Sequence, residues 1–229
     1  YGLMNHKCRI YQEPIFNQVG QFSDGLILAE LKNTQEVVYV DSTAGIVIRG
    51  EFQTYPNYLL KGEFNNGVAV AMKEGKYGRI DQNGEVITEF KYENIGLGNV
   101  IFTYQSEGSW GVLNASNEII ISPIYSSLNI VGNKYIIATL NDTLGILNTA
   151  GNIIVPFTFT NINAIKDNIF IVKNIRGTGF YMGNKLVANV EYDEIGLFNE
   201  DFLYLIKGSS LSYYDLERQK LIEYNEKSE

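Results

Sequence analysis

One stretch recurs along this chain and determines its architecture: Trp110-Gly111-Val112-Leu113-Asn114, followed by Ile119-Ile120-Ile121-Ser122-Pro123-Ile124-Tyr125. Moved 34 positions forward, it matches Leu144-Gly145-Ile146-Leu147-Asn148 and Ile153-Ile154-Val155. Moved 109 positions back, it matches Tyr1-Gly2-Leu3-Met4-Asn5 and Pro14-Ile15-Phe16. A further clear copy begins at Tyr77-Gly78, and weaker copies begin at Val37-Val38, Thr178-Gly179 and Leu211-Ser212. The chain is therefore a tandem array.

The spacing of the copies defines the domain. Positions equivalent to Gly111 fall at 2, 38, 78, 111, 145, 179 and 212, which are steps of 36, 40, 33, 34, 34 and 33 residues. The 229 residues thus hold six full repeats and a partial seventh, and we predict one continuous β-repeat domain over residues 1–229. Because the chain starts at Tyr1 without an initiator Met, we expect it to be part of a longer protein.

Each repeat is predicted to form four short β-strands. An apolar run comes first (as in Tyr135 to Leu140), then the aromatic-Gly segment (Tyr77 to Asp81). A β-branched run follows (Asn152 to Val155), and last a short segment around an aromatic residue (Tyr92 to Ile95). Val, Ile, Tyr and Phe dominate these runs, and Asn- and Gly-containing turns separate them. No stretch keeps a helical period over ten residues, so the fold class is predicted as all-β.

These residues resemble the WG-repeat family, a β-repeat of bacterial proteins. Its unit runs Trp/Tyr-Gly-x-apolar-Asp, a Gly turn, a Val/Ile run, Pro-x-Tyr and Phe-Ser-x-Gly. The chain matches it at Tyr1-Gly2, Tyr77-Gly78, Trp110-Gly111, Pro123-Ile124-Tyr125 and Phe22-Ser23-Asp24-Gly25. It departs from the naming dipeptide at Val37-Val38, Leu144-Gly145 and Thr178-Gly179. The resemblance covers essentially the whole sequence and implies a repeat type and a bacterial source, but no single activity.

Two arrangements would bury both faces of such small sheets. We predict a six-bladed β-propeller, in which the segment Pro14 to Val19 supplies a fourth strand missing from the last blade. The alternative is an open β-solenoid, which explains the leftover N-terminal half-repeat as a cap.

Composition excludes several classes of protein. Apolar residues make up 45% and charged residues 19%, which excludes intrinsic disorder. No apolar run approaches the length of a membrane span. The net charge of −8 argues against nucleic acid as a partner. The compartment stays open among secreted, periplasmic and cytoplasmic.

The sequence offers no catalytic constellation. The single His6 and single Cys8 cannot build a zinc site, and we predict neither a metal nor a cofactor. Asp41, Asp81 and Asp215 share one repeat position with Asn114 and Asn148. Because Asn replaces Asp freely there, we interpret these side chains as hydrogen-bond acceptors that cap turns rather than as general acids.

Candidate residues fall into two groups. The binding candidates lie in loops that break the repeat: Tyr55, Pro56, Tyr58, Asp167, Glu200 and Asp201. The structural candidates mark the repeat: Tyr1, Gly2, Tyr77, Gly78, Trp110, Gly111, Gly145 and Gly179. We expect these glycines to allow close approach between neighbouring sheets, with Tyr77 and Trp110 packed between repeats.

The function predicted from these features is a non-enzymatic interaction module whose loops bind a protein partner. One version is an inhibitor or immunity protein with an acidic face. The alternative is a glycan-binding module that stacks Tyr side chains on sugars. A hydrolase that uses paired loop carboxylates is the third hypothesis.

Overall fold

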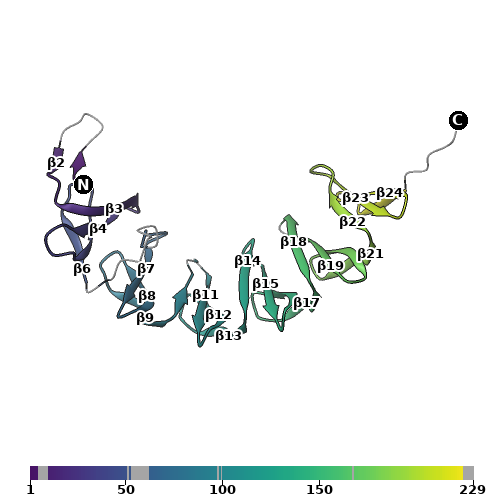
Figure 1. Ribbon diagram of the computed structural model, residues 1–229, viewed down its shortest axis with the longest axis horizontal. Helices are drawn as coiled ribbons and strands as arrows, with labels where there is room; N and C mark the ends of the chain where they lie inside the picture. Colours follow the sequence, from purple (N-terminus) through teal and green to yellow (C-terminus); the bar gives the residue numbers. More distant parts are fainter. Residues whose placement is uncertain are drawn as a thin grey trace. The chain divides into compact units, whose positions relative to one another are not determined.

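The computed structural model describes residues 1–4, 10–50, 52, 62–96, 98, 100–166 and 168–223. Over these residues the chain forms strands and turns and no helix, which confirms the all-β prediction. The strands gather into a series of small antiparallel sheets, each built from strands consecutive in the sequence (Figure 1). The single continuous domain over residues 1–229 stays a prediction.

Contacts along the sequence divide it into two compact units, residues 1–123 and 124–229, with the boundary inside β13. The strands up to this boundary are β1 (Leu3–Met4), β2 (Ile10–Gln12), β3 (Phe16–Ser23), β4 (Leu26–Leu31), β5 (Val37–Val40), β6 (Ile46–Arg49), β7 (Val68–Lys73), β8 (Lys76–Asp81), β9 (Val86–Tyr92), β10 (Asn94–Ile95), β11 (Ile101–Ser106), β12 (Ser109–Asn114) and β13 (Ile119–Tyr125). They form the sheets β1-β2, β3-β4-β5-β6, β7-β8-β9 and β10-β11-β12-β13.

The second unit repeats the same four-stranded plan three times. Its strands are β14 (Ser127–Val131), β15 (Tyr135–Leu140), β16 (Thr143–Asn148), β17 (Ile153–Phe159), β18 (Asn161–Lys166), β19 (Ile169–Asn174), β20 (Gly177–Met182), β21 (Lys185–Tyr192), β22 (Glu194–Leu197), β23 (Phe202–Lys207), β24 (Ser210–Asp215) and β25 (Lys220–Glu223). The sheets are β14-β15-β16-β17, β18-β19-β20-β21 and β22-β23-β24-β25.

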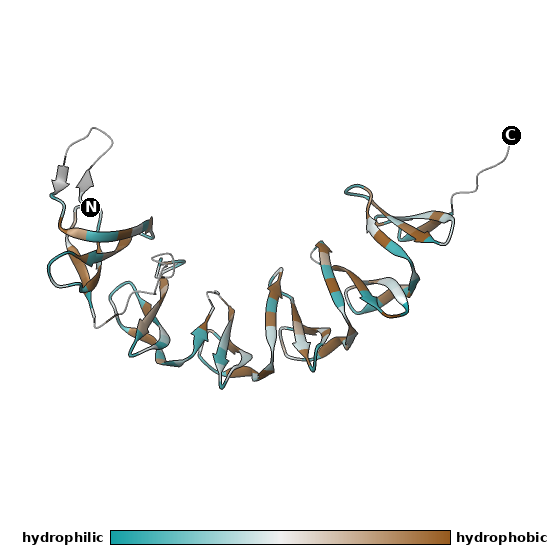
Figure 2. Cartoon of the chain, viewed as in Figure 1, coloured by the Kyte–Doolittle hydropathy of each residue, from teal (hydrophilic) through white to brown (hydrophobic). Residues whose placement is uncertain are grey.

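The hydrophobic core lies between successive sheets of a unit. The central strands of the inner sheet of the second unit carry apolar residues on both faces, because each face meets a neighbouring sheet of that unit; in β20, Tyr181 packs in one cluster and Phe180 in the next, and both are buried. In the second unit one cluster joins Ile146 and Val155 to Phe170, and the next joins Phe180 to Leu203 and Tyr214. Figure 2 shows the hydrophobic residues along the strands and hydrophilic residues at the turns.

The predicted assignment of the fourth strand is wrong. The aromatic segment does not pair back with the third strand of its own repeat; it opens the next sheet, as β10 pairs with β11 and β14 with β15. One residue, Ser126, separates β13 from β14. An antiparallel hairpin needs a loop of at least about two residues, so the backbone does not reverse there and crosses to the next sheet instead.

This correction also removes the predicted strand exchange between the two ends of the sequence. The last sheet, β22-β23-β24-β25, already has four strands, because β22 belongs to it. The strand that begins at Phe16 pairs with β4 in the first four-stranded sheet. The closed propeller and the open solenoid both accommodate sheets of this kind, and the choice between them stays a prediction.

The repeat glycine faces a bulge in the outer strand of its own sheet. In β8 and β9, Tyr77 pairs with Tyr92 and Arg79 with Thr88, so three residues of β9 lie opposite Gly78 alone. The same bulge lies opposite Gly145 in β16 and Gly179 in β20. Extra residues bend the bulged strand, which directs the end of β9 away from its sheet and toward the next one.

Space, rather than backbone conformation, requires the glycine. A Cβ on Gly78 would lie 2.6 Å from the Thr88 carbonyl oxygen and 3.0 Å from the Phe90 ring. On Gly145 it would lie 2.8 Å from the Phe157 ring, which covers that glycine. The close approach expected between neighbouring sheets occurs instead between strands of one sheet, because the bulge brings the outer strand over the glycine.

We predict that Gly78→Ala destabilises the protein by roughly 1–3 kcal/mol, because the added methyl group overlaps a backbone carbonyl that cannot move freely. Chemical denaturation measures the loss. Gly108→Asn is the matched control: Gly108 has φ +76° and open space around its Cβ position, and Asn tolerates that conformation. Equal losses in the two variants would contradict the role assigned to the bulge.

Candidate functional site

A row of capped turns joins the second and third strands of the repeats. Asn148 Oδ1 accepts hydrogen bonds from the backbone N–H of Ala150 at 3.0 Å and of Asn152 at 2.9 Å. Asp81 Oδ1 accepts from Asn83 and Glu85 at 2.9 and 2.8 Å in the same way. Asp41 and Asn114 accept the same two bonds, and Asp215 accepts one, from the Arg218 N–H at 2.8 Å. The copy between β20 and β21 has Met182 at this position. The interpretation of these residues as turn caps is confirmed, and it explains why Asn and Asp exchange there.

The capping bonds also affect the acid–base behaviour of the turns. Donation from the Thr43 side chain and from backbone amides lowers the pKa of the exposed Asp41 carboxyl. The pKa of Asp81 is lowered by the backbone N–H of Glu85 and further turn amides. Both carboxylates therefore stay ionised at neutral pH and hold their turns in one conformation.

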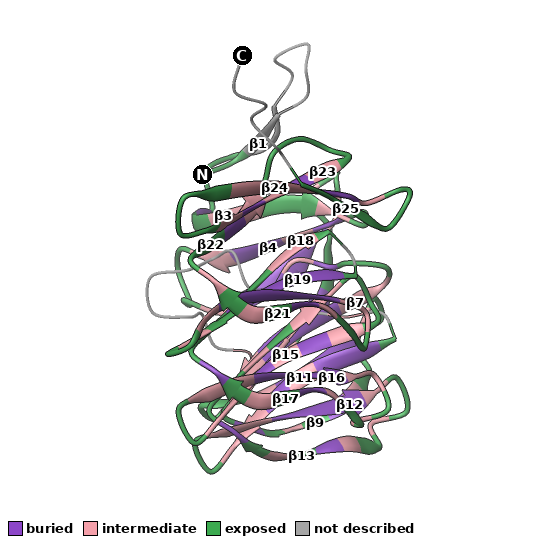
Figure 3. Ribbon diagram, turned by 90° about the vertical axis from the view of Figure 1, so that its right-hand side faces the viewer, coloured by how far each residue is buried: buried purple, intermediate pink, exposed green. Residues whose placement is uncertain are grey.

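Within each unit, loops of neighbouring sheets contact one another on the side of these turns. In the first unit, Asp24 accepts a hydrogen bond from the Gly67 N–H at 2.8 Å, and the Gln82 side chain donates to the Asp24 carbonyl at 2.8 Å. In the second unit, Lys166 Nζ donates to the Glu200 carbonyl. We call the capped turns and the loops beside them the turn rim. Figure 3 shows buried residues on the strands and exposed residues at the turns.

The predicted binding residues are only partly within the described residues. Tyr55, Pro56, Tyr58 and Asp167 lie outside them. Glu200 and Asp201 are exposed in the turn between β22 and β23, where Asn199 Oδ1 accepts from the Asp201 and Phe202 N–H groups at 2.9 Å each. The Asp201 carbonyl accepts from the Leu216 N–H at 2.9 Å, which places this turn on the rim. The role of Glu200 and Asp201 in binding stays a prediction.

The predicted structural residues occupy different environments. Gly78, Gly111, Gly145 and Gly179 are buried, whereas Tyr1 and Gly2 are exposed. Tyr77 and Trp110 are half-buried, and Tyr77 packs against the cluster that contains Tyr92 and Phe102.

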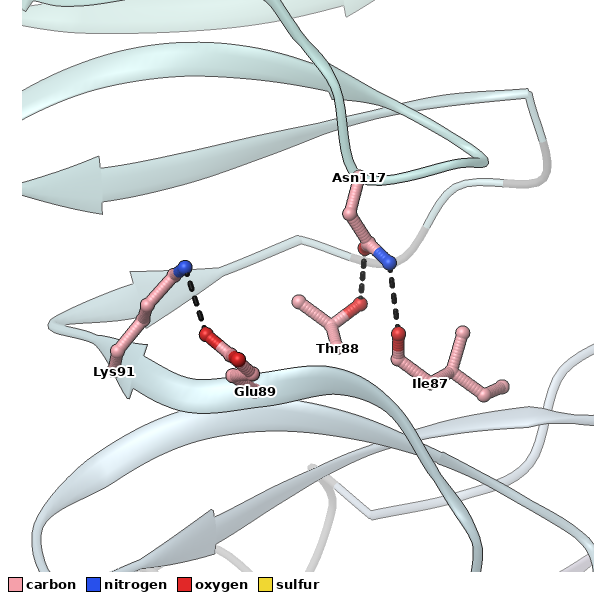
Figure 4. A network of polar contacts seen from close by, with 5 residues as sticks. All are labelled: Ile87, Thr88, Glu89, Lys91 and Asn117. Atoms are coloured by element: carbon pink, nitrogen blue, oxygen red, sulfur yellow. Dashed lines mark hydrogen bonds and ion pairs between the residues drawn. The ribbon is translucent and has the colours of Figure 1, made fainter.

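The first unit contains a buried polar network that the repeat pattern did not predict. Arg79, on β8, is 4% exposed; its Nε donates to Thr88 Oγ1 at 2.9 Å and its Nη2 to Asn117 Oδ1 at 3.3 Å. Its guanidinium carbon lies 3.3 Å from the centre of the Phe102 ring. Asn117 reaches over from the next turn: its Oδ1 accepts from Thr88 Oγ1 at 2.5 Å, and its Nδ2 donates to the Ile87 carbonyl at 2.7 Å (Figure 4).

A signal for this network is present in the sequence, in the departures from the repeat. One residue beyond the repeat glycine, four other copies have the buried apolar residues Tyr39, Val112, Ile146 and Phe180 where this copy has Arg79. At the position of Thr88 they have Ile48, Ile121, Val155 and Ala188. Two polar residues thus replace core residues in one repeat only.

A cleft of about 350 Å³ opens beside this network. It is lined by Ile87, Thr88, Glu89, Lys91, Tyr92 and Asn117. Lys91 Nζ lies 2.9 Å from Glu89 Oε2, and both side chains are exposed. This pairing raises the pKa of Lys91 and lowers that of Glu89. Burial lowers the pKa of the Arg79 guanidinium to about 10, so this residue is still a cation at neutral pH.

Neither a metal centre nor a membrane-spanning helix is found among the described residues. In that part of the protein, no group of three or more His, Cys, Asp or Glu side chains could hold a metal ion. No helix within the same ranges is long and apolar enough to cross a membrane.

Comparison with protein families identifies the repeat. The model of the WG containing repeat matches residues 77–97, 110–143 and 145–174. These three segments match WG repeats. The first two matches begin at Tyr77 and Trp110, and the third at Gly145. WG repeats therefore start at the glycine segment that faces the bulge, and the resemblance drawn from the sequence is confirmed over these residues.

Comparison with solved structures finds β-propellers. Hsv2 of Kluyveromyces lactis is 8% identical, with a TM-score of 0.46 over 96% of this chain and 89% of that chain. The β-propeller domain of Cps50 (Swd1) from Myceliophteria thermophila is 10% identical, with a TM-score of 0.35 over 93% and 90% of the two chains. With both TM-scores below 0.5, the fold assignment rests on the sheets themselves. No curated protein matches this sequence.

We predict that turn caps depend on the acceptor oxygen and not on charge. Asn148→Ala removes the acceptor of two backbone N–H groups and should cost roughly 1–2 kcal/mol of unfolding free energy, whereas Asn148→Asp should cost less than about 0.5 kcal/mol. Thermal and urea denaturation at neutral pH measure both. A similar loss in the two variants would contradict the capping role.

The same caps predict a pH dependence. Because the folded-state pKa of Asp81 lies below its ordinary value of 3.8, the stability it contributes is complete above that value and is lost as the pH falls through the folded pKa. Asp81→Asn caps without titrating. The stability of the wild type relative to Asp81→Asn should therefore decline below pH 3.8. A pH-independent difference between the two melting temperatures would contradict this.

Arg79 and Thr88 are expected to act as one unit. Arg79→Ala should destabilise by roughly 2–4 kcal/mol, because it empties the space over Phe102 and leaves Thr88 without its donor. The double variant Arg79→Met/Thr88→Val restores the apolar pattern of the other repeats. Its stability in urea should match or exceed that of the wild type within about 1 kcal/mol. Losses that add independently would show that the two residues are not coupled.

Proposed function

We propose that this protein is a non-enzymatic interaction module that binds a protein partner through its turn rim. One observation carries the proposal: six repeats expose an aliphatic side chain within the first two residues of the third strand, just after the turn that joins it to the second strand. We call these residues the aliphatic row. They are Ile46, Val86 and Ile119 in the first unit, and Ile153, Leu186 and Leu221 in the second.

In five of the six strands the row residue is exposed although the residue two positions further along is buried; β25 is exposed throughout. Its members are between 38% and 61% exposed, whereas Ile48, Thr88 and Ile121, two residues further along their strands, are at most 5% exposed. Single exposed aliphatic residues are common on protein surfaces. Recurrence at one position in six repeats is different, because the packing of the sheets does not require it.

The location of the row makes its exposure costly without a partner. β6, β9, β13, β17, β21 and β25 each lie at the edge of their sheet in the sheet order. Exposed aliphatic side chains on edge strands favour aggregation, which proteins normally prevent with charged residues at such places. A partner that covers the row removes this liability.

The surroundings of the row favour a protein as partner. The turns place these aliphatic residues next to polar side chains such as Glu85, Glu118 and Asn152, which are all exposed. Apolar residues rimmed by polar ones are typical of protein–protein interfaces. The turns are held by hydrogen bonds before any partner arrives, so binding orders little of the backbone.

The net charge supports a narrower version of the proposal. At −8, the protein attracts basic partners, as an inhibitor or immunity protein for a basic toxin would. The glycan alternative has less support among the described residues, where Tyr1 is the single tyrosine in the set of strongly exposed large apolar residues. The hydrolase hypothesis gains no support from Glu200 and Asp201, whose turn is held by its own backbone bonds.

The test compares two sets of matched variants. A row variant carries Val86→Thr, Ile119→Thr, Ile153→Thr and Leu186→Thr, which keep β-branched or strand-compatible side chains and remove the aliphatic surface. A control variant carries Val100→Thr, Ile124→Thr and Ile175→Thr, exposed by 57% to 97% but outside the row. Each protein is immobilised with a photo-crosslinker next to the row, and captured proteins are quantified by mass spectrometry.

The proposal expects a defined protein that crosslinks to the wild type and the control variant. Its capture by the row variant should fall by about tenfold or more, since apolar anchors dominate the energy of interfaces. Equal capture by all three proteins, or binding of glycans and no protein, would overturn the proposal.

A further inference from the structure

In the Arg79 network, one repeat has a buried charged residue at a position where other copies have an apolar one. The network is independent of the aliphatic row and lies within the first unit. Both partners of the guanidinium, Thr88 and Asn117, are neutral, and the face of the ring of Phe102 covers it on one side. Within the described ranges no carboxylate forms an ion pair with Arg79. The buried positive charge is uncompensated there.

An uncompensated buried cation is unfavourable in a folded protein. Removing a charge from water costs free energy, which an opposite charge close by normally offsets. The other repeats fill this position with apolar side chains at no such cost. The presence of Arg79 and Thr88 in one repeat therefore points to a negatively charged ligand that offsets the burial.

The adjoining cleft has room for such a ligand and polar groups to hold it. Thr88 and Asn117, the two partners of Arg79, form part of its wall. Tyr92 lines it as well, and Tyr104 packs edge-to-face on Tyr92 with ring centres 5.1 Å apart. The Tyr104 hydroxyl is buried without a hydrogen-bond partner among the described residues.

Lys91 and Glu89 at the cleft indicate which anion fits. The Glu89 carboxylate already lies in the lining and binds Lys91, as Figure 4 shows. The carboxylate of a ligand can take the place of the Glu89 carboxylate as the partner of the Lys91 ammonium. Its negative charge then lies in the cleft that Thr88 and Asn117 also line. Glu89 is then an intramolecular competitor. The overall charge of −8 disfavours polyanions, so a single carboxylate is the better match.

We propose that the cleft beside Arg79, lined by Thr88, Lys91, Tyr92 and Asn117, is a binding site for a carboxylate group. The carboxylate can come from a Glu or Asp side group, from the C-terminus of a polypeptide or from a small organic acid. In each case the chemistry is the same: a charge-assisted hydrogen bond from Lys91 and one from the second N–H of the Asn117 amide, next to a buried guanidinium. The Thr88 hydroxyl keeps its bond to Asn117 and only lines the cleft.

The experiment titrates the purified protein with four probes, observed by the side-chain amide signal of Asn117 and the methyl signal of Thr88 in NMR spectra. The probes are acetate, a Gly-Glu-Gly peptide blocked at both ends, a Gly-Gly-Gly peptide with a free C-terminus, and a blocked Gly-Gln-Gly peptide as neutral control. Ionic strength is held constant with chloride, so that screening does not differ between probes.

Variants separate binding from a purely structural role. Arg79→Met/Thr88→Val keeps the apolar pattern of the other repeats and should weaken carboxylate binding by about tenfold or more. Glu89→Gln removes the competitor and should tighten binding several-fold, while Arg79 and its partners stay in place. Arg176→Met, a change at an exposed arginine of the second unit, should leave binding unchanged. If the double variant does not fold, Glu89→Gln still tests the proposal.

The outcomes are distinct. Binding by one or more carboxylate probes and not by Gly-Gln-Gly, tightened by Glu89→Gln, supports the site, and the tightest probe identifies the source. The proposal is overturned if no probe shifts the signals of Thr88 and Asn117. It is also overturned if the neutral peptide binds as well as its glutamate counterpart, or if Glu89→Gln has no effect.

Discussion

The contact between the repeat glycine and the bulge of the neighbouring outer strand controls the rest of the structure. Opposite Gly78 or Gly145, which lack a side chain, the outer strand has three residues instead of one, and the ring of one of them, Phe90 or Phe157, covers the glycine. The bulge bends that strand out of its sheet. A single linking residue then brings the backbone into the next sheet, so the local steric requirement at one glycine sets the path of the whole array.

Once this path is set, successive sheets of a unit cover one another, and the residues next to the glycine become core residues. That is why Tyr39, Val112, Ile146 and Phe180 are buried. It is also why Arg79, at the same position, is notable: the array buries whatever occupies it. The turn rim is controlled in the same way. Because an Asx cap holds its turn in one conformation, the residues that start β6, β9, β13 and β17 are placed alike, and their exposure recurs with the repeat.

Much of this could be predicted from the sequence, because repetition multiplies a weak signal. One Trp-Gly dipeptide says little, but Gly78, Gly111, Gly145 and Gly179 at nearly equal spacing predict the repeat, and the Asp/Asn exchange at 81, 114 and 148 predicts the caps. The sheet boundaries could not be predicted from strand propensity alone. The link between β13 and β14 is a single residue, too short for a hairpin, but its length is known only once both strand ends are known. The Arg79 and Thr88 network could not be predicted from the repeat, because the repeat pattern is defined by what the copies share and these two residues differ from the other copies. The irregular loop with Tyr55 and Tyr58 stands out in the sequence, but it lies outside the described residues.

The crossing of the backbone between sheets has a consequence for how such arrays change over evolutionary time. The strands β10, β14, β18 and β22 each begin a new sheet, whereas the strand before each of them is the last of the previous sheet. Every sheet that they begin therefore combines strands from two sequence repeats. A duplication or deletion of one repeat length therefore leaves no sheet short of a strand, wherever in the repeat the break falls. The gene can therefore gain or lose whole repeats at any point in the repeat, and the sheets on either side of the change still have all their strands.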